Sequence, residues 1–447
     1  MGAPSSLSLK QAFPVWLKIG LLSFGGPAGQ IALMHHELVE KRKWISEERF
    51  LHALNFCTLL PGPEAQQLAT YIGWLLHRTV GGLLAGGLFI VPGAVLMLSL
   101  SMVYAVFHHV PAIEAVFFGI KAAVLAVVVE AVVRIGKRAL KTPAAVAIAA
   151  LAFIALFVFG APFPLIIALS AFAGALGVPV RKGTSQTALV DESPSLIDQL
   201  FSAGKLKHTV PNRRRALLTA CLWLGLWAAP VLALLRWRGP ADVLTREGIF
   251  FSEAAVVTFG GAYAVLAWVT QKAVVTFGWL SAAQMLDGLG LAETTPGPLI
   301  LVLQFTGFLA AYQHPDGLPP LVAGLLGALI TLWVTFVPCF MWIFVFAPWV
   351  EAARGNRRLA AALAAITAAV VGVILNLSVF FSLHVLFARV GVFTLGPMTI
   401  PAPQWSSIDL RAAAVSAVAF GMLFAFKLGL GRTLLACSLL GALLKAV

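Results

Sequence analysis

Long apolar runs separated by short polar segments dominate the chain. Four of them lie at about 80–108, 112–133, 143–160 and 162–180, near or above the about 20 residues that a helix needs to cross a bilayer. These runs are rich in Leu, Ala, Val and Gly and lack the short alternating strands of an outer-membrane barrel. The pattern therefore predicts an all-α polytopic membrane protein.

Composition supports this class and excludes others. The chain is 60% hydrophobic and 11% charged, whereas soluble domains carry roughly 25% charged residues. The net charge of +13 comes from basic residues clustered between apolar runs, which favours the positive-inside rule over a nucleic-acid partner. The four cysteines form no CxxC pair and no zinc spacing, so we expect no metal site.

An internal repeat organises the chain. Three motifs recur at one offset of 235 positions: Phe-Gly-Gly at 24–26 and 259–261, Trp-x-Ser at 44–46 and 279–281, and Pro-Gly-Pro at 61–63 and 296–298. A shared offset without gaps indicates duplication. We predict an N-terminal repeat over 1–180 and a C-terminal repeat over 240–447, joined by a basic cytoplasmic linker (181–215) and one connecting span (216–236).

The number of spans and the charges predict opposite orientations for the two repeats. An odd number of spans separates equivalent points, which is the inverted-repeat plan of many secondary transporters. With a cytoplasmic N-terminus, 19 of the 31 Lys and Arg residues fall in the segments inferred to be cytoplasmic, namely 34–49, 76–79, 134–142, 181–215 and 351–358. We expect a multi-pass protein of a bacterial or archaeal inner (plasma) membrane. The pattern leaves open whether 13–33, 50–76 and their repeats span or re-enter.

The candidate site lies at breaks within the apolar runs. Proline lacks an N–H donor and glycine adopts conformations that no helix needs, so the Gly-Gly-Pro and Pro-Gly-Pro motifs predict broken or re-entrant helices. The alternative is a simple proline kink, but similar breaks at corresponding positions of both repeats favour a binding site. The predicted substrate-binding residues are Gly25, Gly26, Pro27, Gln30, Asn55, Pro61, Gly62, Pro63, Gln66, Gln67, Gly260, Gly261, Thr294, Thr295, Pro296, Gly297 and Pro298.

Charged residues near the breaks are candidates for ion coupling. Glu64 and Glu293 would repel an anion when ionised, but each carboxyl can carry a proton; the alternative is that each caps a half-helix or faces a vestibule. Lys121 would attract an anion, snorkel or pair with another helix. The chain has no phosphate-binding loop and no convincing nucleophile–base set, so we expect neither an enzyme nor a cofactor.

Several stretches resemble the long, two-domain form of the chromate ion transporter family. They are the signature at 22–31, the segment 37–48 and, most specifically, 59–74, which contains the first Pro-Gly-Pro motif. The resemblance implies export of chromate from the cytoplasm, driven by the membrane potential or the proton gradient, and chromate resistance. Sulfate is the natural look-alike. Ala262 and Ala267 depart from the family pattern in the second half.

Other functions stay open at this stage. The site would also suit another anion such as sulfate, or an anionic lipid, and a non-transporting membrane scaffold subunit is a further alternative. The expected partners are a small inorganic oxyanion and the lipid bilayer, and a homodimer is left open.

Overall fold

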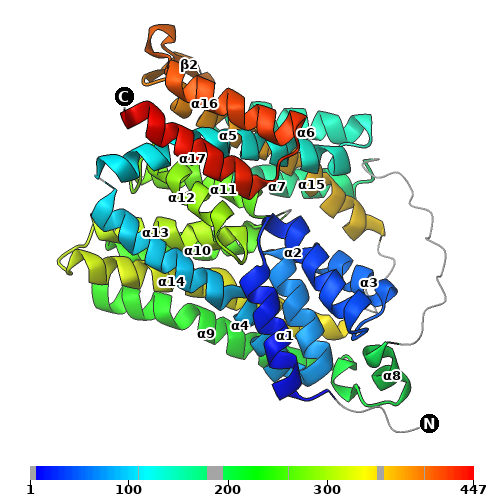
Figure 1. Ribbon diagram of the computed structural model, residues 1–447. Coiled ribbons are helices and arrows are strands. Elements are labelled where there is room, and N and C mark those ends of the chain that lie inside the picture. The colour runs from blue at the N-terminus through cyan, green and yellow to red at the C-terminus, as the bar shows by residue number, and fades with distance from the viewer. Residues whose placement is uncertain are drawn as a thin grey trace. The chain divides into compact units, whose positions relative to one another are not determined.

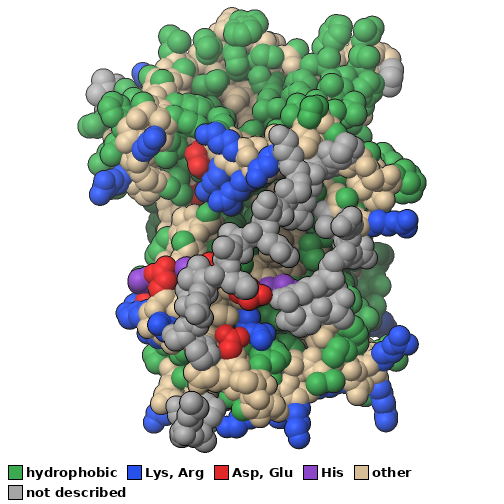
Figure 2. All heavy atoms as spheres, turned by 90° about the vertical axis from the view of Figure 1, so that its right-hand side faces the viewer, with side chains coloured by type: hydrophobic (Ala, Val, Ile, Leu, Met, Phe, Trp, Pro, Cys, Tyr) green, Lys and Arg blue, Asp and Glu red, His purple; other side chains and the backbone are tan. Residues whose placement is uncertain are grey.

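The computed structural model describes residues 7–108, 110–178, 195–259, 261–349, 357–396 and 398–446. These residues are mostly helical (Figure 1), which confirms the predicted all-α class. Within this described part, five helices are long and apolar enough to cross a membrane: Glu64–Phe107, Pro111–Ala139, Arg213–Arg238, Pro320–Trp349 and Ala361–Leu386. Many large apolar side chains are exposed, and hydrophobic side chains cover much of the face shown in Figure 2. The protein is therefore built to lie in lipid.

Two compact units make up the fold, and each combines segments of both predicted repeats. Unit 1 contains Met1–Ser99, Thr184–Ala262 and Thr295–Gly355, and unit 2 contains Leu100–Gly183, Tyr263–Thr294 and Asn356–Val447. The boundaries of the compact units therefore differ from those of the sequence repeats. Residues 181–194 of the predicted linker and 351–356 of a predicted cytoplasmic segment lie outside the described residues.

Unit 1 holds most of the first repeat's early helices together with three helices of the second. Its elements are α1 (Leu9–Leu22), α2 (Gly26–His35), η1 (His36–Lys41), α3 (Glu47–Cys57), most of α4 (Glu64–Phe107), α8 (Leu196–Ser202), η2 (Lys207–Thr209), α9 (Arg213–Arg238), α10 (Val243–Val257), η4 (Leu299–Leu301), α13 (Val302–Gln313), α14 (Pro320–Phe346) and η5 (Ala347–Trp349). Helix α14 packs against α9, α10 and α13.

Unit 2 holds the remaining elements. They are the end of α4, α5 (Pro111–Ala139), α6 (Pro143–Phe157), α7 (Phe163–Ala175), most of α11 (Ala262–Thr270), η3 (Gln271–Thr276), α12 (Ala282–Thr294), α15 (Arg357–Leu386), β1 (Val390–Leu395), β2 (Met398–Pro403), η6 (Trp405–Ser407), α16 (Leu410–Phe420), η7 (Gly421–Ala425) and α17 (Leu430–Ala446). Helix α5 packs against α12, α15, α16 and α17, while α15 also contacts α6 and α7. The antiparallel β1–β2 hairpin is an addition to the all-helical prediction.

Local chemistry sets where many of these helices begin. Proline occupies the first turn of α5, α6, α7 and α14, where its missing N–H leaves no bond unmade. Side chains of Ser8, Thr142, Asn212, Asp242 and Asp409 accept hydrogen bonds from backbone N–H groups in the first turns of their helices. These starts could be found by reading the sequence locally.

The long helix α4 is two antiparallel arms. His77 and Arg78 have non-helical backbone angles, and Arg78 has φ +54°. The arms meet at glycines, because a Cβ added to Gly73 would lie 2.4 Å from the carbonyl oxygen of Gly81. Small residues thus allow close backbone approach, as is usual for packed membrane helices.

The first apolar segment is a helical hairpin rather than one continuous span. The Trp16 and Trp44 ring centroids are 6.4 Å apart, and Lys18 Nζ lies 2.7 Å from Glu37 Oε1. A continuous helix would separate residues 16 and 44 by about 42 Å at about 1.5 Å per residue. The chain therefore turns back after α1.

Candidate functional site: crossed helix breaks in unit 1

Each predicted break uses glycine in a backbone conformation that other residues rarely adopt. The values of φ are +82° at Gly25, +70° at Gly26, +124° at Gly62, +96° at Gly261 and +91° at Gly297. These glycines end one helix and allow the next to start at a new angle. The equivalent site residue Gly260 lies outside the described residues.

The two repeats share their local structure as well as their motifs. The π-helical turns η1 and η3 start at His36 and Gln271, again 235 positions apart. After each turn, the backbone N–H of a tryptophan donates to a backbone carbonyl oxygen six residues earlier. Trp44 donates to Leu38 and Trp279 to Ala273, both with N···O of 2.8 Å. The presence of a π-helical turn at equivalent positions indicates that both copies kept the same backbone conformation after the duplication.

The breaks of the two repeats are joined by a reciprocal pair of hydrogen bonds. Gly62 N–H donates to the carbonyl oxygen of Thr258 with N···O of 2.8 Å, and Gly297 N–H donates to that of Ser23 with N···O of 2.9 Å. Gly62 and Gly297 are equivalent, and so are Ser23 and Thr258. When position i binds j′ and i′ binds j, the contact has local two-fold symmetry. All four residues belong to unit 1.

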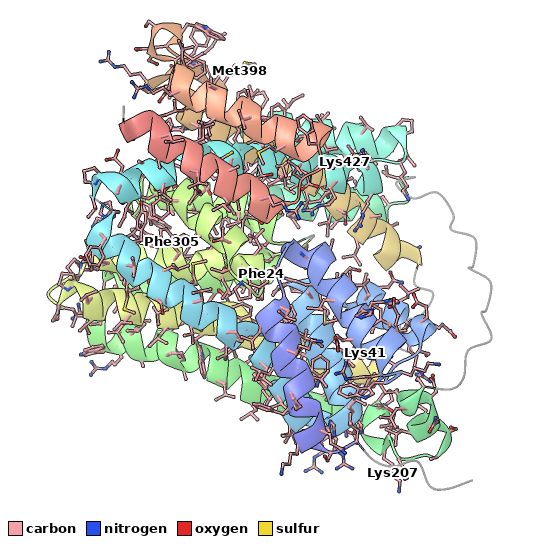
Figure 3. The ribbon with its side chains drawn as sticks, in the orientation of Figure 1. Phe24, Lys41, Lys207, Phe305, Met398 and Lys427 are labelled. Atoms are coloured by element: carbon pink, nitrogen blue, oxygen red, sulfur yellow. The ribbon has the colours of Figure 1, made fainter. Side chains whose placement is uncertain are left out.

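We call the contact made by Ser23, Gly62, Thr258 and Gly297 the crossing. Both N-terminal and C-terminal helix ends lie there. Ser23 and Thr258 are the residues that end α1 and α10, so two C-terminal carbonyl groups accept the glycine N–H groups. Helices α2, α4 and η4 begin beside the same motifs, at Gly26, Glu64 and Leu299. Helix N-termini present unpaired N–H groups and a partial positive charge, which suits an anion. Figure 3 labels Phe24 at the α1–α2 break.

Buried glutamines brace the crossing, mainly from the first repeat. Gln30 Nε2 lies 2.6 Å from the carbonyl oxygen of Gly297 and 3.3 Å from that of Ser23. Gln67 Nε2 donates to the Pro61 carbonyl oxygen at 2.8 Å, and Gln66 Nε2 to a threonine hydroxyl at 3.0 Å. Each amide nitrogen has two hydrogens, so Gln66 and Gln67 keep donor capacity beyond these bonds.

The second Pro-Gly-Pro motif packs directly on α4. A Cβ on Gly93 would lie 2.1 Å from the Pro296 carbonyl oxygen, so α4 can approach only because position 93 is glycine. Thr295 and Pro298 are buried in the same unit. Gln304, which the sequence-based site set omits, donates from Nε2 to the Ala94 carbonyl oxygen at 3.1 Å.

Other predicted site residues of the first repeat lie nearby in sequence but differ in burial. Pro27 is in the first turn of α2, and Pro63 is buried directly before α4. Glu64 is half-buried in the first turn of α4, whereas Asn55 is exposed on α3.

Three predicted residues belong to unit 2 and have partners there. Lys121 Nζ on α5 lies 3.6 Å from Asp287 Oδ2 on α12, so the structure pairs this lysine with another helix. The same carboxylate oxygen accepts the hydroxyl of Tyr104 at 2.8 Å. Glu293 accepts the hydroxyl of Tyr263, and Thr294 Oγ1 donates to its own helix.

A charged cluster surrounds η1 in unit 1. Lys18 and Arg42 both bind the Glu37 carboxylate, whose side chain is 3% exposed. Burial alone would raise the pKa of Glu37, but the hydrogen bonds and charges of Lys18 and Arg42 outweigh it and lower the pKa below 4.5. Lys41 is labelled at the end of η1 in Figure 3.

Helix α8 is docked beside this cluster. Its first backbone N–H groups, from Leu196 and Ile197, donate to the carbonyl oxygens of Lys43 and Trp44 at 3.0 Å. Burial opposes ionisation of Asp198, but hydrogen bonds from Ser195 and Arg49 hold the pKa of this carboxyl below its ordinary value. The described part of the predicted linker is therefore attached to the first repeat.

The arrangement defines a helical membrane protein with a broken-helix core of the kind that transporters use for binding. The profile of the chromate transporter family matches residues 10–175 and 247–444. A chromate transport protein of Pseudomonas aeruginosa is 35% identical over 83% of this chain and 80% of its own length, and one of Cupriavidus metallidurans is 27% identical over 82% and 81%. An uncharacterised transporter of Bacillus subtilis is 36% identical over 28% of this chain and 64% of its own length. No solved structure matches significantly. The chain belongs to the chromate transporter family.

Proposed function

We propose that this protein is a secondary transporter that exports chromate from the cytoplasm across the inner membrane and so confers chromate resistance. The names of its relatives supply the substrate, and the reciprocal bonds between Gly62, Thr258, Gly297 and Ser23 are the observation that supports a shared site. The two repeats have inverted topology in this proposal, with α9 as the connecting span.

Chromate is a tetrahedral dianion, and the crossing offers donors rather than fixed charges. Backbone N–H groups at the starts of α2 and α4, with the remaining amide hydrogens of Gln66 and Gln67, form its binding shell. Uncharged donors bind a dianion without the tight ion pair that would slow its release.

Membrane energetics favours the proposed direction. Moving two negative charges out of a cell that is negative inside releases about 4.6 kcal/mol of free energy per 100 mV of membrane potential. The membrane potential alone can therefore drive export, and the proton gradient can add to it.

The test is chromate uptake into inside-out vesicles with an imposed lumen-positive potential. Gln67→Ala is expected to lower the initial rate about tenfold, which corresponds to about 1.4 kcal/mol, and excess sulfate is expected to compete. Gln404→Ala, at an exposed glutamine of unit 2, is the matched control. Absence of uptake by folded, correctly oriented wild-type protein would exclude chromate as the substrate, and equal rates in both variants would exclude Gln67 from the site.

A further inference from the structure

Glu247 on α10 is a fully buried acid that the sequence-based interpretation did not use. Its relative exposure is 0%, and neither carboxylate oxygen has a hydrogen-bond partner among the described residues. The equivalent position in the first repeat is Ala12, which is also fully buried. The carboxyl is therefore a feature of the second repeat that helix packing does not require.

The carboxyl group points into the crossing of α13 and α14. A Cβ on Gly327 of α14 would lie 2.9 Å from Glu247 Oε2 and 2.4 Å from the carbonyl oxygen of Gly307 on α13. A Cβ on Gly307 would lie 2.1 Å from Thr331 Oγ1, a buried hydroxyl that also has no partner among the described residues. Two glycines thus make room for a carboxyl beside two further oxygens.

Among the described residues, no basic side chain pairs with Glu247. Asp242 at the start of α10 takes the guanidinium of Arg238 from α9, with Nε···Oδ2 of 2.8 Å. The only titratable side chains that α13 and α14 carry are Tyr312 and Cys339, neither of which is a base. Arg246 and Glu253 of α10, on either side in sequence, are exposed.

An ionised carboxylate in such surroundings would cost many kcal/mol, so the packed state requires that the charge be removed. A hard cation such as Ca²⁺ takes about six to eight oxygen ligands, and one carboxylate with one or two neutral oxygens falls well short. A proton removes the charge without a shell of ligands, because the resulting acid O–H needs at most a single acceptor.

We propose that Glu247 is the proton-binding site that couples this transporter to the proton gradient, an inference that rests on the proposed export function. The carboxylate takes up a proton from water on one side of the membrane, is carried neutral in the packed state, and releases it to water on the other. Release requires water to reach the contact between α10 and the α13–α14 pair.

Helix α10 links this site to the crossed breaks. Thr258, whose carbonyl accepts the Gly62 N–H, is 11 residues beyond Glu247, or about 16 Å along a helix at about 1.5 Å per residue. Movement of α10 on loss of the proton would therefore alter the hydrogen bond between Gly62 and Thr258, one of the two that join the repeats.

Infrared difference spectroscopy of purified protein tests proton binding without relying on transport. Protonated and ionised carboxyls absorb at different frequencies. The band of a buried protonated carboxyl is expected in wild type and in Glu253→Gln, an exposed acid on the same helix, and to be lost in Glu247→Gln. Because Asp287 and Glu293 are also buried acids, the decisive quantity is the intensity that the substitution removes, and an unchanged band intensity in Glu247→Gln would overturn the proposal. If that variant does not fold, Glu247→Asp replaces it, and a band unchanged in frequency in this variant has the same meaning.

Vesicle transport tests coupling. With the potential clamped, a pH gradient is expected to stimulate chromate transport by wild type and Glu253→Gln but not by Glu247→Gln, which should still respond to the potential. Equal stimulation of Glu247→Gln and wild type would overturn the coupling role. Absence of any wild-type transport counts against the proposed function, while the infrared result still decides proton binding.

Discussion

Gly62 shows how one residue meets a backbone and a packing requirement together. Its φ of +124° disfavours any side chain, and a Cβ there would lie 2.7 Å from Cys339 Sγ and 2.9 Å from Gln67 Nε2. Its N–H also makes one of the two bonds between the repeats. A substitution at this position therefore strains the backbone and displaces two neighbours.

Gly62→Ala is expected to lower the free energy of unfolding by about 1–3 kcal/mol. The measurement is thermal unfolding of the purified protein in detergent. Gly87→Ala on α4 is the control, because nothing lies within 4 Å of its Cβ position and alanine favours a helix by roughly 0.5–1 kcal/mol over glycine. Equal melting temperatures for the two variants would contradict the role assigned to Gly62.

At the scale of elements, the α1–η1 hairpin is held by a buried ion cluster. Glu37 is almost fully buried and receives Lys18 from α1 and Arg42 from the end of η1. Removing a partner of a buried carboxylate, or protonating the carboxylate, breaks the ion pairs and destabilises the fold. The stability of the hairpin is therefore expected to depend on pH.

The pKa of Glu37 is lower in the folded protein than its ordinary value of 4.5. Its contribution to stability is therefore complete above about pH 4.5 and is lost as the pH falls through the lower, folded value. Glu37→Gln is expected to cost about 1–2 kcal/mol at neutral pH, with a smaller difference from wild type in acid.

Unfolding measured across the acid range in detergent checks this. Glu48→Gln, at an exposed acid of α3, serves as the control and should keep the wild-type pH profile. If Glu37→Gln also follows that profile, the ion cluster does not stabilise the hairpin.

At the scale of the whole molecule, the repeats are predicted to face opposite sides of the membrane. Equivalent loops carry different charge, with four Lys or Arg residues in 34–49 and one in 272–282. Positively charged loops stay in the cytoplasm. We therefore predict that equivalent residues of the two repeats lie on opposite faces of the membrane.

Single cysteines at equivalent, exposed positions test this topology. In a background without the four native cysteines, Glu48→Cys is expected to react with a membrane-impermeant maleimide only from the cytoplasmic side, and Ala283→Cys only from the outside. Labelling of both from one side would show that the repeats are parallel.

The class of protein, the duplication and the positions of the helix breaks could all be predicted from the amino-acid sequence. Hydropathy, the offset of 235, and the Gly and Pro motifs are local properties, and the glycines at 25, 62 and 297 have the positive φ that those motifs indicate. Local chemistry is enough for these features because backbone sterics and lipid solvation act on each segment separately.

Which groups contact one another depends on how the helices pack. The bond from Gly62 to Thr258 joins residues almost 200 positions apart, and Lys121 finds its partner in Asp287 on another helix. The sequence shows that residue 247 is an acid. Its burial away from basic partners depends on α13 and α14, which come later in the chain. No local pattern encodes such partners, because they arise when helices far apart in the sequence pack into the same compact unit.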